Sequence, residues 1–313
     1  MTSSNLNTKN LFLLLFFSSL FFLFFSCKQP EPEALKLERI AYVSNGTIHV
    51  AGLKDGTHTE VGKGLEPSIS YDGRYLAYVT NVGNKQRIAV LDFPNRQTSI
   101  VDEVQGTAWG PAWSPAENNF LFSARVQGQD NGYQLIIVGH ARNDKKYVLS
   151  RPGHDIFSPT WAFDGQTVFG HDTRIMYQWE KTGHLISHFV LNEKFGQLSY
   201  NASTRIEPSP DGSYWLIATG QQEPAGKQRR TTLNLHIFDE TNNTLKKVSH
   251  ENVFIGEASW GADNQTIIFS GKDRRNQRQN DLYILSLADN SIKPFQKNAT
   301  QPCYRTIKVA QAK

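Results

Sequence analysis

Cysteine is scarce in this chain: Cys27 and Cys303 are the two thiols among 313 residues. A fold held together by disulfides needs several cysteines, so a disulfide framework is excluded. The sequence also has no CxxC pair, no GxSxG elbow, no HExxH helix and no phosphate-binding glycine loop. The common catalytic and metal-binding motifs are therefore missing, and the interpretation depends on the longer-range pattern of the chain.

The chain also lacks a large excess of basic or acidic residues. The chain has 33 Lys and Arg against 29 Asp and Glu, a formal net charge of +4. This excess is too small to indicate nucleic acid as a partner. The pairs His154-Asp155 and His171-Asp172 come nearest to a metal site, but two histidines without a third ligand do not make one. The sequence predicts ordinary loop histidines there, and no metal and no cofactor.

What the chain does contain is a turn phrase that recurs five times, at steps of 44 to 52 residues. The phrase combines proline, an aromatic residue, a small residue, Asp and Gly, and its copies are 67–73 (PSISYDG), 111–117 (PAWSPAE), 159–165 (PTWAFDG), 206–212 (IEPSPDG) and 258–264 (ASWGADN). Proline and Asp favour tight turns, and Gly accepts the left-handed backbone that closes them. Each copy therefore predicts a hairpin between two short apolar strands.

Each repeat has room for four short strands, and no convincing amphipathic helix interrupts them. Such units are typical of propeller blades. Residues 39–61 contain three strand candidates without a turn phrase, and 301–309 (QPCYRTIKV) is a single strand with nothing after it. We expect an all-β, six-bladed β-propeller of four-stranded antiparallel blades, in which the C-terminal strand joins the first blade and closes the ring.

The turn phrases resemble the W-S-P-D-G signature of TolB-like six-bladed propellers. The residues 209–212 (SPDG) match it fully, 113–115 (WSP) match its first part, and Trp161 and Trp260 with the turns that follow match it more loosely. The resemblance covers residues 37–313. It implies the propeller fold, while the functions of relatives range from periplasmic partner binding to substrate gating in peptidases and polysaccharide cleavage.

The N-terminus predicts export and lipid anchoring. Lys9 precedes fifteen residues, 11–25, that are all Leu, Phe or Ser, and Ser26-Cys27 follows. This run is shorter than a membrane-spanning helix, and its flanks are those of a signal peptide. A small residue before Cys27 resembles the lipobox of bacterial lipoproteins, whose cysteine carries fatty acyl chains such as palmitate. We expect residues 1–26 to be a signal peptide, 27–36 a tether and 37–313 the propeller.

Two surfaces are candidate binding sites. The residues just before each turn phrase should ring the mouth of the central channel: Glu66, Gly110, Ser158, Arg205, Glu257 and Gln301. Two loops of neighbouring blades form a candidate basic patch: Lys227, Arg229, Arg230, Lys272, Arg274, Arg275 and Arg278. Both surfaces have a simpler interpretation, a wet channel and solvated hairpin tips.

The tryptophans of the turn phrase, Trp113, Trp161 and Trp260, share one strand position, which predicts packing between blades. Trp109 and Trp179 lie outside that position and are candidates for surface contact. Cys303 is predicted to be a small buried residue on the closing strand.

Together these features predict a non-catalytic binding or scaffold protein of the bacterial envelope, facing the periplasm or the cell surface. It is expected to be a monomer that recognises an envelope protein, peptide or glycan. The alternative is a metal-assisted enzyme that degrades polysaccharides on a propeller scaffold.

Overall fold

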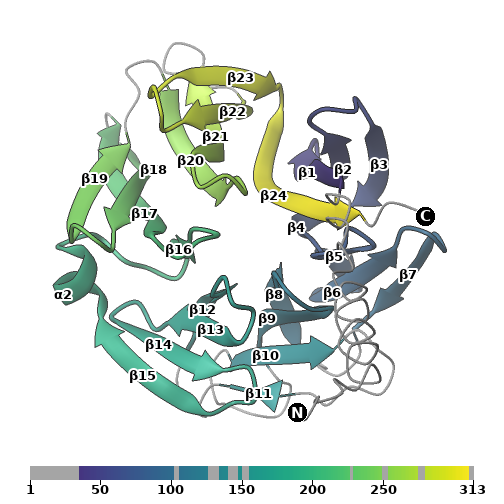
Figure 1. Cartoon of the computed structure of the whole chain (residues 1–313), viewed down its shortest axis with the longest axis horizontal. Coiled ribbons are helices and arrows are strands. Elements are labelled where there is room, and N and C mark those ends of the chain that lie inside the picture. Colours follow the sequence, from purple (N-terminus) through teal and green to yellow (C-terminus); the bar gives the residue numbers. More distant parts are fainter. Residues whose placement is uncertain are drawn as a thin grey trace, which may run out of the picture. The chain divides into compact units, whose positions relative to one another are not determined.

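The computed structural model describes residues 35–101, 106–125, 134–139, 147–149, 155–225, 228–248, 253–273 and 279–309. Residues 1–34, including Cys27, lie outside this part of the chain, as does His154. In the unit Lys36–Val309, six four-stranded antiparallel sheets are arranged as blades around a central channel (Figure 1). The predicted β-propeller is confirmed.

The strands follow one another outward from the channel in each blade. Blade 1 contains β24 (Ala299–Val309), β1 (Leu35–Ser44), β2 (Thr47–Gly52) and β3 (His58–Lys63). Blade 2 contains β4 (Leu65–Ile69), β5 (Tyr75–Val82), β6 (Lys85–Asp92) and β7 (Gln97–Ile100). Blade 3 contains β8 (Thr107–Trp113), β9 (Asn119–Arg125), β10 (Gln134–Gly139) and β11 (Tyr147–Val148).

The other three blades repeat this order. Blade 4 contains β12 (Phe157–Trp161), β13 (Thr167–His171), β14 (Ile175–Glu180) and β15 (Leu185–Val190). Blade 5 contains β16 (Arg205–Pro208), β17 (Tyr214–Ala225), β18 (Gln228–Asp239) and β19 (Thr244–Val248). Blade 6 contains β20 (Val253–Trp260), β21 (Thr266–Asp273), β22 (Asp281–Ser286) and β23 (Ile292–Gln296).

Blade 1 is a composite blade that combines strands from the two ends of the propeller sequence, as predicted from residues 39–61 and 301–309. Its innermost strand, β24, follows the last strand of blade 6 and pairs with β1 (Figure 1). Ala299 and Tyr304 of β24 pack with Ile40 of blade 1 and Ile268 of blade 6 in one buried cluster. This strand therefore fixes the first blade to the last, and it removes the open edges that an unclosed ring would expose.

The recurring phrase forms the turn between the first two strands of a blade. In blade 2 the Gly73 N–H donates to the Ser70 carbonyl oxygen at 3.0 Å, and Gly73 has φ +70°. The Ser70 hydroxyl donates to Asp72 at 2.6 Å and accepts from the Tyr75 N–H at 2.9 Å. The serine and aspartate side chains thus supply hydrogen-bond partners within the turn itself. This explains why these residue types recur in the phrase.

The tryptophans of the turn phrase pack between blades, in agreement with the prediction. Trp161 Nε1 donates to the Ala112 carbonyl oxygen of the preceding blade at 2.9 Å, and Trp260 Nε1 donates to the Glu207 carbonyl oxygen at 3.2 Å. Trp179 is 4% exposed and belongs to the same buried cluster as Trp161, so its predicted role in surface contact is wrong. Its place on a central strand, β14, explains the burial.

A short helix, α2 (Leu191–Phe195), interrupts the all-strand pattern after blade 4. The Lys194 ammonium lies 5.0 Å from the centre of the Phe189 ring and pairs with Glu240 at 2.6 Å. The apolar residues Leu191 and Phe195 are buried. The helix therefore covers the outer edge between blades 4 and 5, and sequence analysis missed it because five residues are too few to show a helical period.

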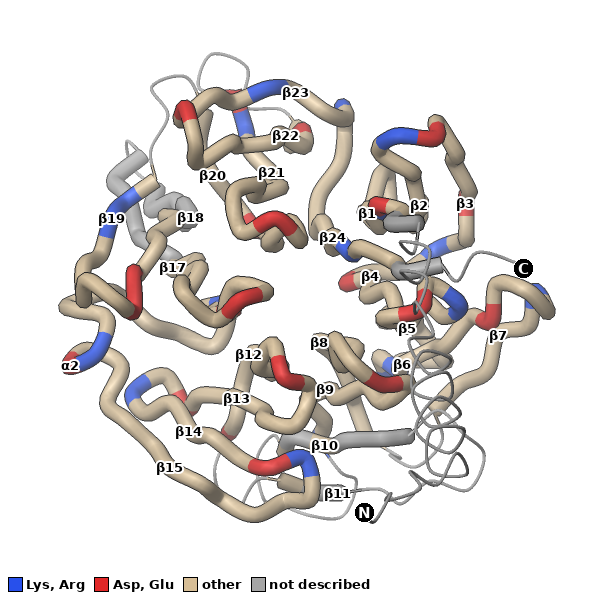
Figure 2. The backbone as a smooth tube through the Cα atoms, in the orientation of Figure 1, with Lys and Arg blue, Asp and Glu red and all other residues tan. Residues whose placement is uncertain are grey.

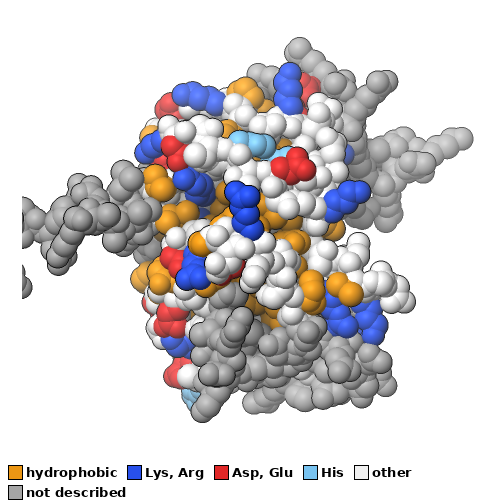
Figure 3. Space-filling view, turned by 90° about the vertical axis from the view of Figure 1, so that its right-hand side faces the viewer, with side chains coloured by type: hydrophobic (Ala, Val, Ile, Leu, Met, Phe, Trp, Pro, Cys, Tyr) orange, Lys and Arg blue, Asp and Glu red, His pale blue; other side chains and the backbone are white. Residues whose placement is uncertain are grey.

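The outer rim carries no dominant kind of side chain on the side seen in Figure 3, where hydrophobic, basic and acidic side chains are interspersed. Among the described residues, no helix is long and apolar enough to cross a membrane.

The composite blade predicts that the closing strand is essential for stability. Deleting residues 301–313 should strip blade 1 of most of its inner strand, and we expect aggregation or a fall in Tm of roughly 10 °C or more, measured by calorimetry. Deleting only residues 310–313, beyond β24, is the matched control and should leave Tm unchanged. A chain without residues 301–313 that melts like the parent would contradict closure by β24.

Candidate functional site

A cavity of about 680 Å³ occupies the centre of the propeller and is lined by all six innermost strands. The six positions predicted at the channel mouth all line it: Glu66, Gly110, Ser158, Arg205, Glu257 and Gln301. We call these six residues the polar ring. The structure therefore brings the predicted residues together, while their role in binding stays a prediction.

Three members of the polar ring hold the backbone of the next blade. The Glu66 carboxylate accepts the Gly110 N–H at 2.6 Å, and the Glu257 carboxylate accepts the Gln301 N–H at 3.2 Å. The Gln301 amide oxygen accepts the Glu66 N–H at 2.9 Å. Glu66, Gly110 and Gln301 have φ values of 49°, 64° and 53°. These side chains are thus part of the framework as well as of the channel surface, a role that sequence analysis missed.

An ion pair crosses the polar ring. Arg205 Nη2 of blade 5 lies 2.9 Å from a Glu66 oxygen of blade 2, and the two side chains are 38% and 24% exposed. Blades 2 and 5 are opposite each other in a ring of six. A ligand entering at this end would therefore meet the guanidinium and the carboxylate first.

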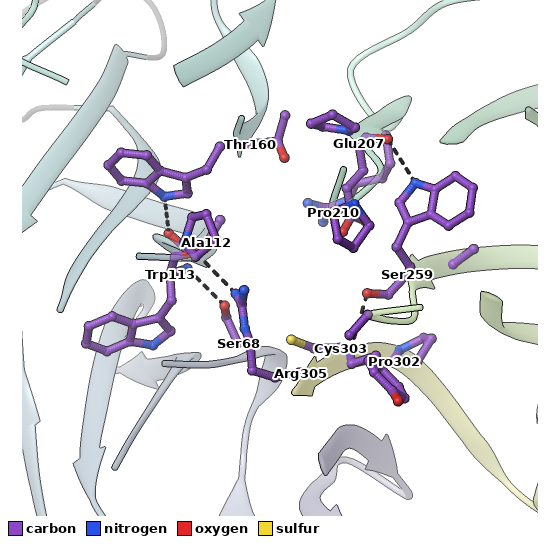
Figure 4. Close-up of a pocket in the computed structure, with 18 of the residues that line it drawn as sticks. Ser68, Ala112, Trp113, Thr160, Glu207, Pro210, Ser259, Pro302, Cys303 and Arg305 are labelled. Atoms are coloured by element: carbon purple, nitrogen blue, oxygen red, sulfur yellow. Dashed lines mark hydrogen bonds between the residues drawn. The ribbon is translucent and has the colours of Figure 1, made fainter. Parts of the chain in front are cut away.

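A second level of side chains repeats the contact between blades. The Ser68 hydroxyl accepts the Trp113 N–H at 3.1 Å, and the Ser259 hydroxyl accepts the Tyr304 N–H at 3.3 Å (Figure 4). Glu207 occupies the same strand position in blade 5 and also lines the cavity. A carboxyl group therefore stands in the channel where the equivalent residues of blades 2 and 6 are serines.

The interior of the channel disfavours carboxylate charge. Burial raises the pKa of Glu207 to about 7, although Arg305 and Arg205 oppose the shift. Burial also raises the pKa of Glu257, with Arg205 opposing and Glu66 adding to the shift. Arg205 thus acts on Glu66, Glu207 and Glu257, and Arg305 is the stronger counter-charge of Glu207. A cationic group that entered the channel would favour the ionised form of these carboxyl groups.

Arg305 is a channel residue that sequence analysis missed. Its Nε donates to the Ile69 carbonyl oxygen and its Nη2 to the Trp113 carbonyl oxygen, both at 3.2 Å (Figure 4). The signal was available, because alignment on the turn phrase puts Arg305 where the other blades have Ser, Ala or Gly. β24 continues through Arg305 to Val309, whereas the other inner strands turn near this position, and the long side chain joins blades 1, 2 and 3.

Cys303 also lines the channel, from the closing strand. Burial raises the pKa of its thiol, which opposes formation of the reactive thiolate. Cys303 lies on β24, as predicted, but its side chain is half-buried instead of fully buried.

The basic patch falls largely outside the described residues. Lys227, Arg274, Arg275 and Arg278 are not described, and for Arg229 and Arg230 the structure gives the backbone only, opposite Pro224 and Glu223 in the β17–β18 hairpin. Lys272 is half-buried on β21. The patch therefore stays a prediction.

His171 is a structural residue. It is 0% exposed, its Nε2 lies 3.0 Å from the Thr204 carbonyl oxygen, and its Nδ1 accepts the Thr173 N–H at 3.1 Å. Burial lowers its pKa, so the ring is neutral with the proton on Nε2. Both nitrogens are occupied, and in the described part of the chain no group of three His, Cys, Asp or Glu residues could hold a metal.

Neither a protein-family model nor the sequence of a curated protein matches this chain. Solved structures do match it. TolB from Acinetobacter baumannii gives a TM-score of 0.63 at 17% identity over 85% of this chain, which spans 66% of that protein. A protein assigned as TolB from Agrobacterium tumefaciens gives 0.56 at 12% identity over 88% of this chain and all of that one.

A chain from the nidogen/laminin complex gives a TM-score of 0.60 at 8% identity, over 88% of this chain and all of that one. The fold is therefore that of a β-propeller, similar to the propellers of the two TolB structures and of the chain from the nidogen/laminin complex. At these identities the likeness establishes the fold alone.

The raised pKa of Glu207 predicts a pH-dependent stability. The folded-state pKa lies above the unfolded value of 4.5, so stability falls as pH rises from about 4.5 through about 7. Glu207→Gln should remove this loss. The variant should match the parent near pH 4 and be more stable near pH 8, by at most ~3 kcal/mol in urea unfolding.

Glu193→Gln is the matched control, because Glu193 is exposed on α2. It should shift stability equally little at both pH values. A constant difference between Glu207→Gln and the parent across the pH range would show that Glu207 is ionised at no cost.

Proposed function

We propose that this chain is a non-catalytic binding or scaffold propeller of the bacterial envelope that captures a protein, peptide or glycan partner at the polar ring. The observation that supports this is the convergence of charged side chains on one cavity of about 680 Å³. Concave sites with a few well-placed polar groups are the usual form of a ligand site. Hydrogen bonds between blades hold Glu66 and Glu257 in place, so little conformational entropy is lost when a ligand binds.

The chemistry of the ring suggests which groups a partner would offer. Arg205 can pair with a carboxylate or a glycan acid, and its forked guanidinium can do so through two hydrogen bonds. Glu207 and Glu257 can accept from an ammonium or from hydroxyl groups. The end of a peptide carries one such group, and a glycan carries many hydroxyls. We propose that the protein acts as a monomer, with one such site.

The anchoring proposal rests on the sequence of residues 1–36. Cys27 would be acylated after removal of residues 1–26, and residues 27–36 would hold the propeller close to the membrane surface. The similarity in fold to TolB proteins is consistent in kind with an envelope location.

Capture of a partner from envelope extract of the native host tests the function. Arg205→Ala with Glu257→Ala should abolish capture, because these changes remove the guanidinium and one of the carboxyls that face the cavity. The amount of partner retained on the immobilised full chain is measured by mass spectrometry. The matched control is Lys293→Ala with Glu193→Ala, two exposed residues away from the channel, which should retain the partner fully.

A second variant separates the polar ring from the basic patch. Reversal of Arg229, Arg230, Arg274 and Arg275 to Glu should leave capture intact if the polar ring is the site. Loss of capture in this variant, with retention in the Arg205 and Glu257 variant, would move the site to the patch. Full retention of the partner by both the polar-ring variant and the basic-patch variant would exclude both surfaces as the binding site.

Replacing Cys27 by Ser tests the anchor. The lipoprotein proposal predicts that Cys27→Ser either releases the protein from the membrane fraction or leaves the uncleaved precursor, which intact-mass measurement distinguishes. Gln29→Ala, which changes the tether and keeps Ser26 and Cys27, is the control and should leave the membrane fraction unchanged. If Cys27→Ser changes neither the membrane fraction nor the mass, the protein is not acylated at this residue.

A further inference from the structure

The channel has a second end, formed by the turn tips. Here each innermost strand, or the turn after it, places a side chain five positions beyond the polar ring: Tyr71, Pro115, Phe163, Pro210, Ala262 and Thr306. We call these six residues the tip ring. All except Tyr71 line the cavity, so the tip ring and the polar ring belong to the same channel. The channel therefore has a charged end at the polar ring and a largely apolar end at the tip ring.

Phe163 is the main apolar feature of the tip ring. It is 55% exposed, which makes it the most exposed large hydrophobic side chain in the described part of the chain, and Tyr71 is 37% exposed. A Cβ atom added to Gly212 of the next blade would lie 2.5 Å from the Phe163 ring. The ring thus packs directly on a glycine backbone and is held in place while one face stays open. A fixed, exposed aromatic residue is a typical anchor of a protein interface.

Negative charge surrounds this apolar end. The residue after each tip position is acidic in four blades: Asp72, Asp164, Asp211 and Asp263. Burial opposes ionisation of Asp72 and Asp211, but hydrogen bonds from Ser70 and Ser209, together with those from backbone N–H groups, outweigh it, and the pKa of each Asp is lowered.

The pKa of Asp263 is lowered as well, since the hydrogen bonds from Thr266 and from backbone N–H groups, including that of Gln265, together outweigh burial. Glu117 adds a fifth carboxylate and pairs with Lys181. Among the other described cations near this end, Arg74 pairs with Asp92 at 3.1 Å, Lys54 pairs with Glu38 at 3.0 Å, and Arg305 donates to backbone carbonyl oxygens of blades 2 and 3. Acidic residues are visible at the inner ends of several blades in Figure 2. The tip ring is thus an apolar surface inside a rim that stays negative at neutral pH.

We propose that the tip ring binds a protein segment with a proline-rich or aromatic tip flanked by Lys or Arg. Proline-rich segments are rigid before binding and dock against aromatic and proline side chains at low entropic cost. The flanking cations would face the turn carboxylates, which favours association with this segment over an acidic one. This surface is separate from the polar ring, so one propeller could hold two partners at opposite ends of its channel.

Three end-capped synthetic peptides test the proposal by calorimetric titration into the purified full chain: RPPWPPR, its acidic counterpart EPPWPPE and the flexible basic peptide RGGSGGR. We expect RPPWPPR to bind at least tenfold more tightly than either of the others. Its affinity should fall as salt rises, because the rim charges are exposed and screened within a Debye length of about 8 Å at physiological ionic strength. Absence of binding by RPPWPPR, or equal binding by EPPWPPE, would overturn the proposal.

Variants locate the peptide. Phe163→Ala should weaken binding of RPPWPPR at least tenfold, and Phe163→Tyr, which keeps the ring, should restore it. Asp164→Asn with Asp263→Asn keeps the Oδ1 atoms that accept the turn N–H groups and replaces the Oδ2 atoms that accept from the Thr167 and Thr266 hydroxyls. This double variant removes two rim charges and should weaken RPPWPPR selectively. Because Phe163 is exposed, Tm should stay within about 1 °C of the parent.

Arg205→Ala separates this proposal from the function proposed for the polar ring, since it should leave the peptide affinity unchanged. Loss of peptide binding in Arg205→Ala, with retention in Phe163→Ala, would place the peptide at the polar ring and overturn the inference. A concentration-dependent dimer that disappears in Phe163→Ala would make a second copy the occupant of the tip ring, and would equally overturn it.

Discussion

The pairing of β24 with β1 is the interaction on which the rest of this structure depends. A propeller blade cannot bury both faces alone, so each blade needs a neighbour on either side, and blade 1 meets blade 6 only when β24 is in place. The channel follows from this closure, because its wall consists of the six innermost strands. Both the polar ring and the tip ring exist only in the closed ring.

Hydrogen bonds between blades explain why the inner strands look as they do. The N–H groups of Gly110, Gln301 and Glu66 need acceptors, because these residues turn left-handed next to the channel. The acceptors come from the preceding blade, through Glu66, Glu257 and Gln301. A polar side chain at this position therefore first accepts a backbone N–H group of the next blade. Only the polar atoms left over are available to a ligand.

Much of the fold could be predicted from the sequence because it repeats. Residues of the types found at Ser70, Asp72 and Gly73 recur because the geometry of a tight turn requires them. Such local requirements can be recognised from the sequence alone. The polar ring could be located because its members sit at one offset from that turn. Arg305 and the charge state of Glu207 were missed, since both depend on contacts between blades that are far apart in the chain. Trp179 was misjudged because its burial depends on a cluster that joins its own blade, through Trp161, with Leu121 of blade 3.

The composite blade also has a kinetic consequence. Residues 299–309 must find partners in residues 35–44, across almost the whole propeller, and contacts of such sequence separation are slow to form. Until β24 arrives, β1 exposes an unpaired edge to other chains at a stage when the remaining blades can already be folded. The last step of folding is therefore the one most open to misassembly, and a chaperone that shields the edge of β1 would act where the chain is most vulnerable.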